Sequence, residues 1–179
     1  MSARNNVINA SLFMIGWLAC LWGGSSWWLL ISLAALAWHF VLISSWSAEG
    51  KTVISVMLAG ATLDSFLLQM GVLTYPGNPA LVPIWQALFW ALLGTTLNHS
   101  LAWSGRRWWL SSLVGAAAAF ACYGAIGTVR GVGLGEHPPT TLAITAASWA
   151  ILFPLLHGFA HLYRDQYRMK LAAGRNRSR

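Results

Sequence analysis

Long apolar stretches, separated by short polar turns, make up almost the whole chain. A helix that crosses a bilayer needs about 20 mostly apolar residues, and six stretches reach or approach this length. Prolines, glycines and charged residues mark the turns between them. The pattern predicts six transmembrane helices at residues 5–22, 27–45, 52–73, 82–103, 108–129 and 140–163. We therefore predict an all-α fold: a polytopic membrane protein in which residues 1–163 form a single bundle with short loops.

The composition agrees with a membrane protein. Hydrophobic residues make up 57% of the 179 positions and charged residues only 8%, whereas soluble domains carry about 25% charged residues. A soluble fold with so few charges would expose large apolar patches. Cys20 and Cys122 lie inside apolar stretches and have no metal-type spacing, so we interpret them as packing residues.

Positive charge is concentrated in the predicted basic tail, residues 164–179. Six of the eleven lysines and arginines lie there: Arg164, Arg168, Lys170, Arg175, Arg177 and Arg179. A basic segment beside a membrane helix contacts anionic lipid headgroups, and this distribution argues against nucleic acid as a partner. The residues expected to contact headgroups are Arg106, Arg107, Arg164 and Arg168.

The other basic residues predict the orientation. If the N-terminus is cytoplasmic, the predicted cytoplasmic side holds the tail, Arg4, Lys51 and the pair at 106–107, and the outer side holds only Arg130. Cytoplasmic loops of membrane proteins carry an excess of Lys and Arg. We therefore predict that both termini are cytoplasmic, which requires an even number of crossings.

Asp64 is the one acidic side chain that we place inside the predicted membrane region. It shares a narrow helical stripe with Met57, Gly60, Leu68 and Gly71, since helical residues advance about 100° each. Glycines on such a stripe indicate the close approach of another helix, so Asp64 is expected to face the bundle. Two interpretations stay open: a carboxyl that handles a proton or anchors a substrate, or a hydrogen bond between helices.

The predicted helix 82–103 carries an excess of polar residues in its last third. Thr95 and His99 lie four residues apart on one face, and Asn98 lies three residues from Thr95. This set predicts a hydrated pocket near the cytoplasmic face. We take Asp64, Asn98 and His99 as candidate catalytic residues, although the helical rise places Asp64 and His99 more than about 10 Å apart in depth. Candidate ligand-binding residues are Thr95, Trp85, Trp90 and His39.

The histidines allow a metal hypothesis. His157 and His161 lie four residues apart on one helical face, a spacing that can chelate a metal, and His39 and His99 are expected at a similar depth. His161 is also close enough to the headgroups to be interfacial. We expect no bound metal and no cofactor, and we keep His157 and His161 as the alternative.

A series of short motifs in the middle of the chain is similar to a known family. The motifs are Leu63-Asp64-Ser65, Gly71-Val72-Leu73, Pro83-Ile84-Trp85, Leu88-Phe89-Trp90 and Thr95-Thr96-Leu97-Asn98-His99-Ser100-Leu101. They resemble DUF2878, a bacterial family of small membrane proteins of unknown function, and the resemblance covers most of the chain. It implies a multi-pass protein of the bacterial inner (cytoplasmic) membrane but transfers no catalytic residue. Such proteins are often encoded beside enzymes that modify unsaturated fatty acyl chains, including cyclopropane-synthase-like ones, and this context points to membrane lipid.

Three functions remain open from the sequence. The first is an enzyme, or an accessory subunit of one, that acts on acyl chains or headgroups at the cytoplasmic leaflet and uses Asp64, Asn98 and His99. The second is a small proton-coupled transporter with Asp64 as the titrating group. The third is a structural or assembly partner without chemistry of its own. Membrane lipids are the expected partners, and a homo-oligomer or a partner membrane enzyme is left open.

Overall fold

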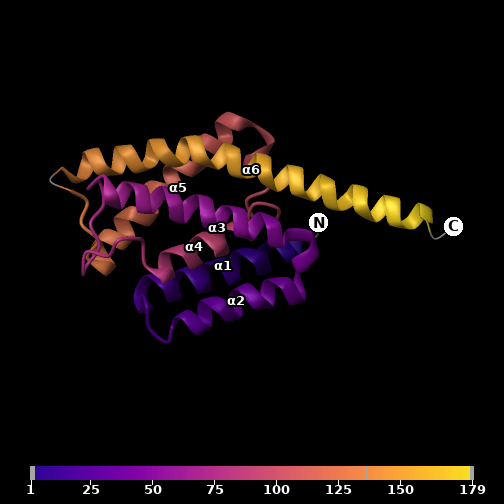
Figure 1. Ribbon diagram of the computed structural model, residues 1–179, viewed down its shortest axis with the longest axis horizontal. Coiled ribbons are helices and arrows are strands. Elements are labelled where there is room, and N and C mark those ends of the chain that lie inside the picture. Colours follow the sequence, from indigo (N-terminus) through magenta and orange to yellow (C-terminus); the bar gives the residue numbers. More distant parts are fainter. Residues whose placement is uncertain (1–2, 136, 178–179) are drawn as a thin grey trace.

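The chain folds as a bundle of helices (Figure 1). The computed structural model describes residues 3–135 and 137–177. In these ranges the elements are α1 Ala3–Gly23, α2 Leu29–Leu42, α3 Trp46–Gln69, α4 Ile84–Gly94, the short 3-10 helix η1 Ser104–Arg106, α5 Trp108–Arg130 and α6 Pro138–Arg177. The β contact in the described ranges is an isolated antiparallel bridge between Thr74 and Gly133. The predicted all-α fold is therefore confirmed.

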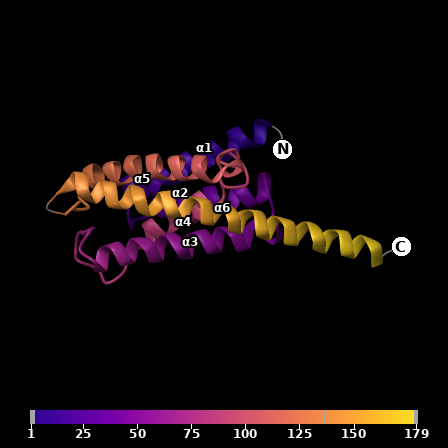
Figure 2. The ribbon, with the colours of Figure 1, turned by 90° about the horizontal axis from the view of Figure 1, so that it is seen from above.

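α4 is the central element. It packs against α1, α2 and α3, and its buried side chains include Trp85, Phe89 and Trp90. α1 and α2 form one hairpin, α5 and α6 form another, and α3 packs against both α4 and α6 (Figure 2). Because α4 has neighbours on several sides, it buries apolar side chains all round its axis.

The prediction of a helix at residues 82–103 is wrong for the second half of this range. α4 ends at Gly94, and residues 95–103 form consecutive tight turns. The hydroxyls of Thr95 and Thr96 donate to carbonyl oxygens three residues earlier, at 2.7 and 2.6 Å. Such local side-chain bonds compete with the regular helical pattern. Irregular backbone at membrane depth is tolerated where protein surrounds it, and more than half of this segment is buried.

Four of the described helices are long and apolar enough to cross a membrane: α1, α3, α5 and α6. α2 has 14 residues and α4 has 11, fewer than the roughly 20 that a straight span needs. The N-terminus and the free end of α6 lie at the same end of the bundle (Figure 1). The long apolar helices support a membrane protein, while six crossings and cytoplasmic termini stay predictions.

α6 is longer than predicted. We expected the last helix to end at residue 163 and a separate tail to follow, but α6 continues to Arg177; residues 178–179 of the predicted tail lie outside the described residues. No glycine or proline occurs between 164 and 173, so nothing in this stretch interrupts a helix. Arg164, Arg168 and Lys170 therefore stand on a helix that extends beyond the bundle (Figure 1).

The close approach predicted at Gly60 is confirmed. A Cβ atom at this position would lie 1.8 Å from the Trp90 ring, so the absence of a side chain lets the ring of α4 pack directly on α3. Gly71 has a different role from the one predicted. It follows the end of α3 with a φ of +70° and with nothing within 4 Å of where a Cβ would be, so it serves the turn, a conformation that glycine adopts easily.

Candidate functional site

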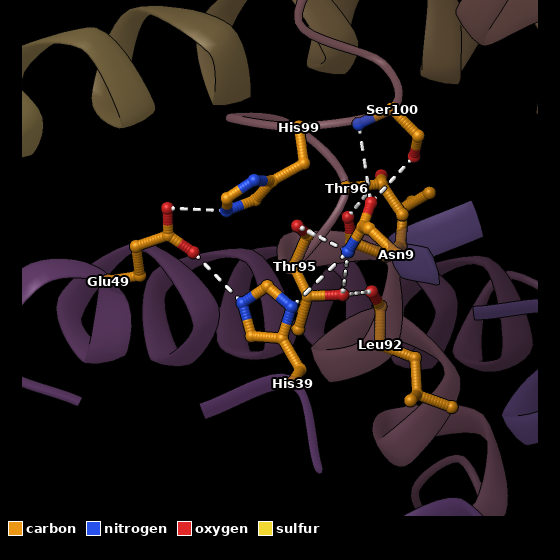
Figure 3. A network of polar contacts seen from close by, with 9 residues as sticks. Asn9, His39, Glu49, Leu92, Thr95, Thr96, His99 and Ser100 are labelled. Atoms are coloured by element: carbon orange, nitrogen blue, oxygen red, sulfur yellow. Dashed lines mark hydrogen bonds and ion pairs between the residues drawn. The ribbon is translucent and has the colours of Figure 1, made fainter. Parts of the chain in front are cut away.

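Glu49 lies between two histidines that come from distant parts of the chain (Figure 3). His39 Nε2 lies 3.0 Å from Glu49 Oε2, and His99 Nε2 lies 2.8 Å from Glu49 Oε1. The two imidazole rings meet edge to face, with their centroids 5.1 Å apart. Only 1% of His39, 8% of Glu49 and 3% of His99 is exposed. We call these three residues the His–Glu–His cluster.

Two reversals of the chain assemble this cluster. His39 is in the last turn of α2 and Glu49 in the first turn of α3. Only residues 43–45 separate these helices, so the two side chains face each other across a tight connection. Ser45 is in the extended conformation, which ends one helix direction and starts the next. His99 reaches the cluster from the turns that follow α4.

Asn9 of α1 fixes the orientation of the His39 ring (Figure 3). Its amide nitrogen donates to the Thr95 carbonyl oxygen at 3.1 Å, and its amide oxygen accepts from the Ser100 N–H at 3.3 Å and hydroxyl at 2.7 Å. These bonds determine which way the amide faces. The same nitrogen lies 3.2 Å from His39 Nδ1. Nδ1 is therefore the acceptor, and the ring hydrogen of neutral His39 is on Nε2, directed at Glu49.

The cluster presents atoms that bind transition metals. One nitrogen from each histidine and one carboxylate oxygen of Glu49 lie within 4.8 Å of one another. Two imidazoles and a carboxylate form a common ligand set for zinc and for non-haem iron. His99 Nδ1 is buried and has no hydrogen-bond partner among the described residues. The cluster is thus polar, enclosed and incompletely hydrogen-bonded.

Asp64 forms a second buried centre, apart from the cluster. Its Oδ2 accepts hydrogen bonds from Gln86 Nε2 at 2.6 Å and Trp90 Nε1 at 2.7 Å, and its Oδ1 accepts one from the Tyr123 hydroxyl. Asp64 and Glu49 are fifteen positions apart on α3, or about 22 Å along the helix. Asp64 is therefore remote from the cluster to which His99 belongs, as the sequence predicted.

Some of the candidate residues predicted from the sequence belong to these two centres, and Asn98 and Trp85 belong to neither. Thr95 and His39 belong to the hydrogen-bond network of the cluster, and Trp90 belongs to the Asp64 centre. Asn98 is buried next in sequence to His99, outside the network that the described residues form around the cluster. Trp85 lies near the start of α4, where the Arg130 guanidinium is 5.7 Å from its ring centroid.

The remaining candidates lie at the surface or have other partners. The arginines expected at headgroups are exposed at 106, 107 and 168 and half-buried at 164. His157 Nε2 lies 2.9 Å from the Ser104 hydroxyl. His161 contacts Arg164. Neither histidine belongs to the group of possible metal ligands found among the described residues, which is the His–Glu–His cluster.

Glu49 and Asn9 belong to the candidate site, but neither was selected from the sequence. The predicted helices end at residue 45 and begin again at Thr52, so Glu49 falls in the connection between them. The sequence does contain a pattern that indicates a helix start before Glu49, because a serine at position 45 followed by an acidic residue within one turn is typical of a helix N-terminus. Asn9 lies within the predicted helix 5–22, and no local pattern distinguishes it, although it is buried among polar partners in α1.

An apolar groove between α2 and α3 leads towards the cluster. Its volume is about 300 Å³, and α4 forms its floor. The lining residues are Leu29, Leu33, Leu36, Trp46, Val53, Ile54, Met57, Ile84, Ala87, Leu88 and Ala91. Leu36 lies one turn before His39 on α2, and Val53 lies one turn after Glu49 on α3. Residues three or four apart share a helix face, so lining residues of the groove lie one helical turn from the cluster on both α2 and α3, although the three cluster residues do not themselves line it.

Together, the long apolar helices and the enclosed polar cluster define the class of this protein: a small helical protein of the membrane type. The sequence profile of DUF2878, a family described as proteins of unknown function, matches residues 6–155. The chain belongs to this family. No curated protein and no solved structure matches it. The matched range contains both the His–Glu–His cluster and the Asp64 centre, so both are parts of the domain that defines the family.

Proposed function

We propose that this protein is a multi-pass protein of the bacterial inner membrane that holds a membrane lipid in the groove between α2 and α3 and takes part in its modification at the His–Glu–His cluster. The observation that carries the proposal is the spacing of the two features along α2 and α3: the lining of an apolar groove between these helices comes within one helical turn of the buried polar cluster. A membrane lipid has apolar acyl chains and a polar headgroup. The apolar groove suits the chains, and the polar cluster suits the headgroup.

The size and lining of the groove support an acyl chain as the occupant. All the residues around it are apolar, and Ala87 and Ala91 on α4 leave room at its floor. Ligand sites are typically concave and mostly apolar, with a few polar groups that orient the ligand. Here the polar groups are those of the cluster, at one end of the groove.

The charge near the cluster supports a headgroup that is anionic. Lys51 follows Glu49 by two positions and is exposed, and Arg106 and Arg107 follow His99 within eight positions and are also exposed. Basic residues next to membrane helices attract anionic lipids. The same residues carry the positive-inside signal, which supports the cytoplasmic leaflet as the place of binding and cytoplasmic termini for a chain with six crossings.

The proposal covers two forms of participation. In the first, the protein is itself the enzyme and the cluster carries the chemistry. In the second, it presents the lipid to a partner enzyme of the membrane, as a homo-oligomer or as a subunit. The transport alternative has less support, since both oxygens of Asp64 are already hydrogen-bonded in a fully buried centre. Such packing is better suited to holding α3, α4 and α5 together.

The test combines lipid retention with lipid composition. Ala87→Phe fills the floor of the groove, and Ala121→Phe adds the same side chain on the exposed face of α5 as a matched control. We expect native mass spectrometry of the purified protein to show bound phospholipid in the wild type and in Ala121→Phe but little in Ala87→Phe. We also expect membranes of a deletion strain to differ in acyl-chain composition from those of the parent. Equal lipid retention in both variants, together with unchanged lipid composition, would refute the proposal.

A further inference from the structure

We propose that His39, Glu49 and His99 bind one divalent transition-metal ion of the zinc or ferrous-iron class. This inference names a cofactor for the site of the proposed function. The role of the ion there rests on that proposed function. The binding itself follows from the geometry of the cluster and can be tested without any lipid.

The first argument is the convergence of ligand atoms. Nε2 of His39 and Nε2 of His99 approach opposite oxygens of one carboxylate, at 3.0 and 2.8 Å, and three ligand atoms lie within 4.8 Å of one another. Metal–nitrogen and metal–oxygen bonds to zinc are about 2.0–2.2 Å long. An ion at the centre of these atoms would thus reach all three after small side-chain movements.

The second argument is the identity of the ligands. Two histidines and one carboxylate leave coordination positions open for water or a substrate, as in catalytic zinc sites and in non-haem iron sites. Imidazole ligands favour such ions over magnesium and calcium, which prefer oxygen. A site of this type could supply a Lewis acid or a redox centre beside the headgroup or acyl chain in the groove.

The third argument is burial. Each of the three residues is more than nine-tenths buried, and buried charges in proteins are paired or coordinate a metal. The other described histidines of α6 differ: His157 contacts a serine and His161 an arginine. Only the cluster directs two imidazoles and a carboxylate at a common point within the described part of the chain.

The hydrogen-bond network shows what an ion has to displace. In the arrangement described, His39 carries its hydrogen on Nε2 because Asn9 donates to Nδ1. An ion on Nε2 would move that hydrogen to Nδ1, and the Asn9 amide would have to turn its oxygen towards it, which gives up its present bonds to the Thr95 carbonyl and to Ser100. Histidines that bind metals usually donate their second N–H to such an acceptor. His99 would undergo the same shift of its hydrogen from Nε2 to Nδ1, and its Nδ1 has no acceptor among the described residues.

The experiment uses the full chain in detergent or nanodiscs, stripped with a chelator and dialysed against Zn²⁺ or Co²⁺. Bound metal is then counted by plasma mass spectrometry, with Mg²⁺ as the comparison ion. The variants are Glu49→Gln and His99→Gln, and the matched control is His161→Gln, which removes a histidine of α6 outside the cluster. We expect the wild type and the control to retain Zn²⁺ and Co²⁺ but not Mg²⁺. We expect Glu49→Gln and His99→Gln to lose at least tenfold in affinity.

Two outcomes would overturn the inference: no Zn²⁺ or Co²⁺ retained by the wild type, or equal retention in the control and in both cluster variants. If a cluster variant fails to fold, the Co²⁺ absorption spectrum of the wild type decides instead, since bands typical of nitrogen and oxygen ligands support the site and their absence refutes it. Lipid retention is measured on the same preparations. A wild type that binds lipid but no metal refutes the metal site and leaves the proposed function standing, whereas metal without lipid refutes the proposed function.

Discussion

Glu49 and His99 are fifty positions apart in the chain, yet their side chains meet at 2.8 Å inside the bundle. The contact joins the first turn of α3 to the turns that follow α4. Glu49 also faces His39 at the end of α2. One carboxylate is therefore the common partner of two buried imidazole rings, and it ties three segments of the chain together.

Glu49→Leu should destabilise the protein strongly. The substitution leaves two buried imidazole N–H groups without an acceptor, and removing one partner of a buried ion pair or charged hydrogen bond costs about 3–5 kcal/mol. We expect a decrease of about 3 kcal/mol in the free energy of unfolding, measured by denaturant titration in detergent. Glu49→Gln, which keeps one acceptor oxygen, should lose less. A loss below about 0.5 kcal/mol, as for an ordinary surface substitution, would contradict the structural role of Glu49.

Asn9→Ala should loosen the segment after α4. Asn9 connects α1 to the Thr95 carbonyl and to Ser100, and both contacts are lost with the amide. A buried carbonyl or N–H left unpaired costs about 1–3 kcal/mol, so we expect a decrease of about 2 kcal/mol in the free energy of unfolding. Hydrogen exchange should rise at residues 95–100. Ser11→Ala, on an exposed position of α1, is the control and should change neither quantity.

Tyr123→Phe should weaken the Asp64 centre without affecting the cluster. The substitution removes one of three donors to the carboxyl and the acceptor of the Trp149 N–H, and a buried polar group left without a partner costs about 1–3 kcal/mol. We expect a decrease of about 2 kcal/mol in the free energy of unfolding with lipid retention and metal content unchanged. A double-mutant cycle with Asp64→Asn should give a coupling free energy of at least about 0.5 kcal/mol. Loss of lipid at unchanged stability would instead assign Asp64 a direct functional role.

Gly60→Ala should be harmful, whereas Gly124→Ala should not. A methyl group at position 60 would lie 1.8 Å from the Trp90 ring, whereas nothing lies within 4 Å of the same atom at position 124 in α5. Overpacking of this kind costs about 1–3 kcal/mol, while glycine to alanine in an open helical position gains up to about 1 kcal/mol. Thermal unfolding of the two variants gives the comparison. Trp90→Phe alone removes a donor to Asp64, so the comparison is a double-mutant cycle: Gly60→Ala should cost less in the Trp90→Phe background than in the wild type, and an equal cost would place the clash elsewhere.

The helices themselves were largely predictable from the sequence, because apolar periodicity and length carry most of the information. The predicted segment 108–129 nearly coincides with α5 at Trp108–Arg130. The stripe of Gly60 and Asp64 correctly indicated a face packed against another helix, since small residues permit close contact and a buried carboxyl needs donors. These features are local, and a single segment is enough to recognise them.

The cluster could not be predicted in the same way, because its contacts join residues far apart in the chain. Glu49 stands two positions before Lys51, and its charged neighbourhood resembles a loop. Only the short connection from α2 and the turns at residues 95–103 bring His39 and His99 to it. The end of α4 at Gly94 was missed because residues 95–103 contain neither glycine nor proline, while the hydrogen bonds of Thr95 and Thr96 to their own backbone determine the local path.

The position at which α4 ends has an electrostatic consequence. Peptide dipoles in a helix add up to about half a negative charge at its C-terminal end, and in α4 this end lies inside the bundle, at Gly94, rather than in water. The field of the helix therefore falls on the segment that carries Thr95 and His99. Broken helices of membrane transporters stabilise cations at such ends. In this protein the same field favours a cation bound beside Glu49.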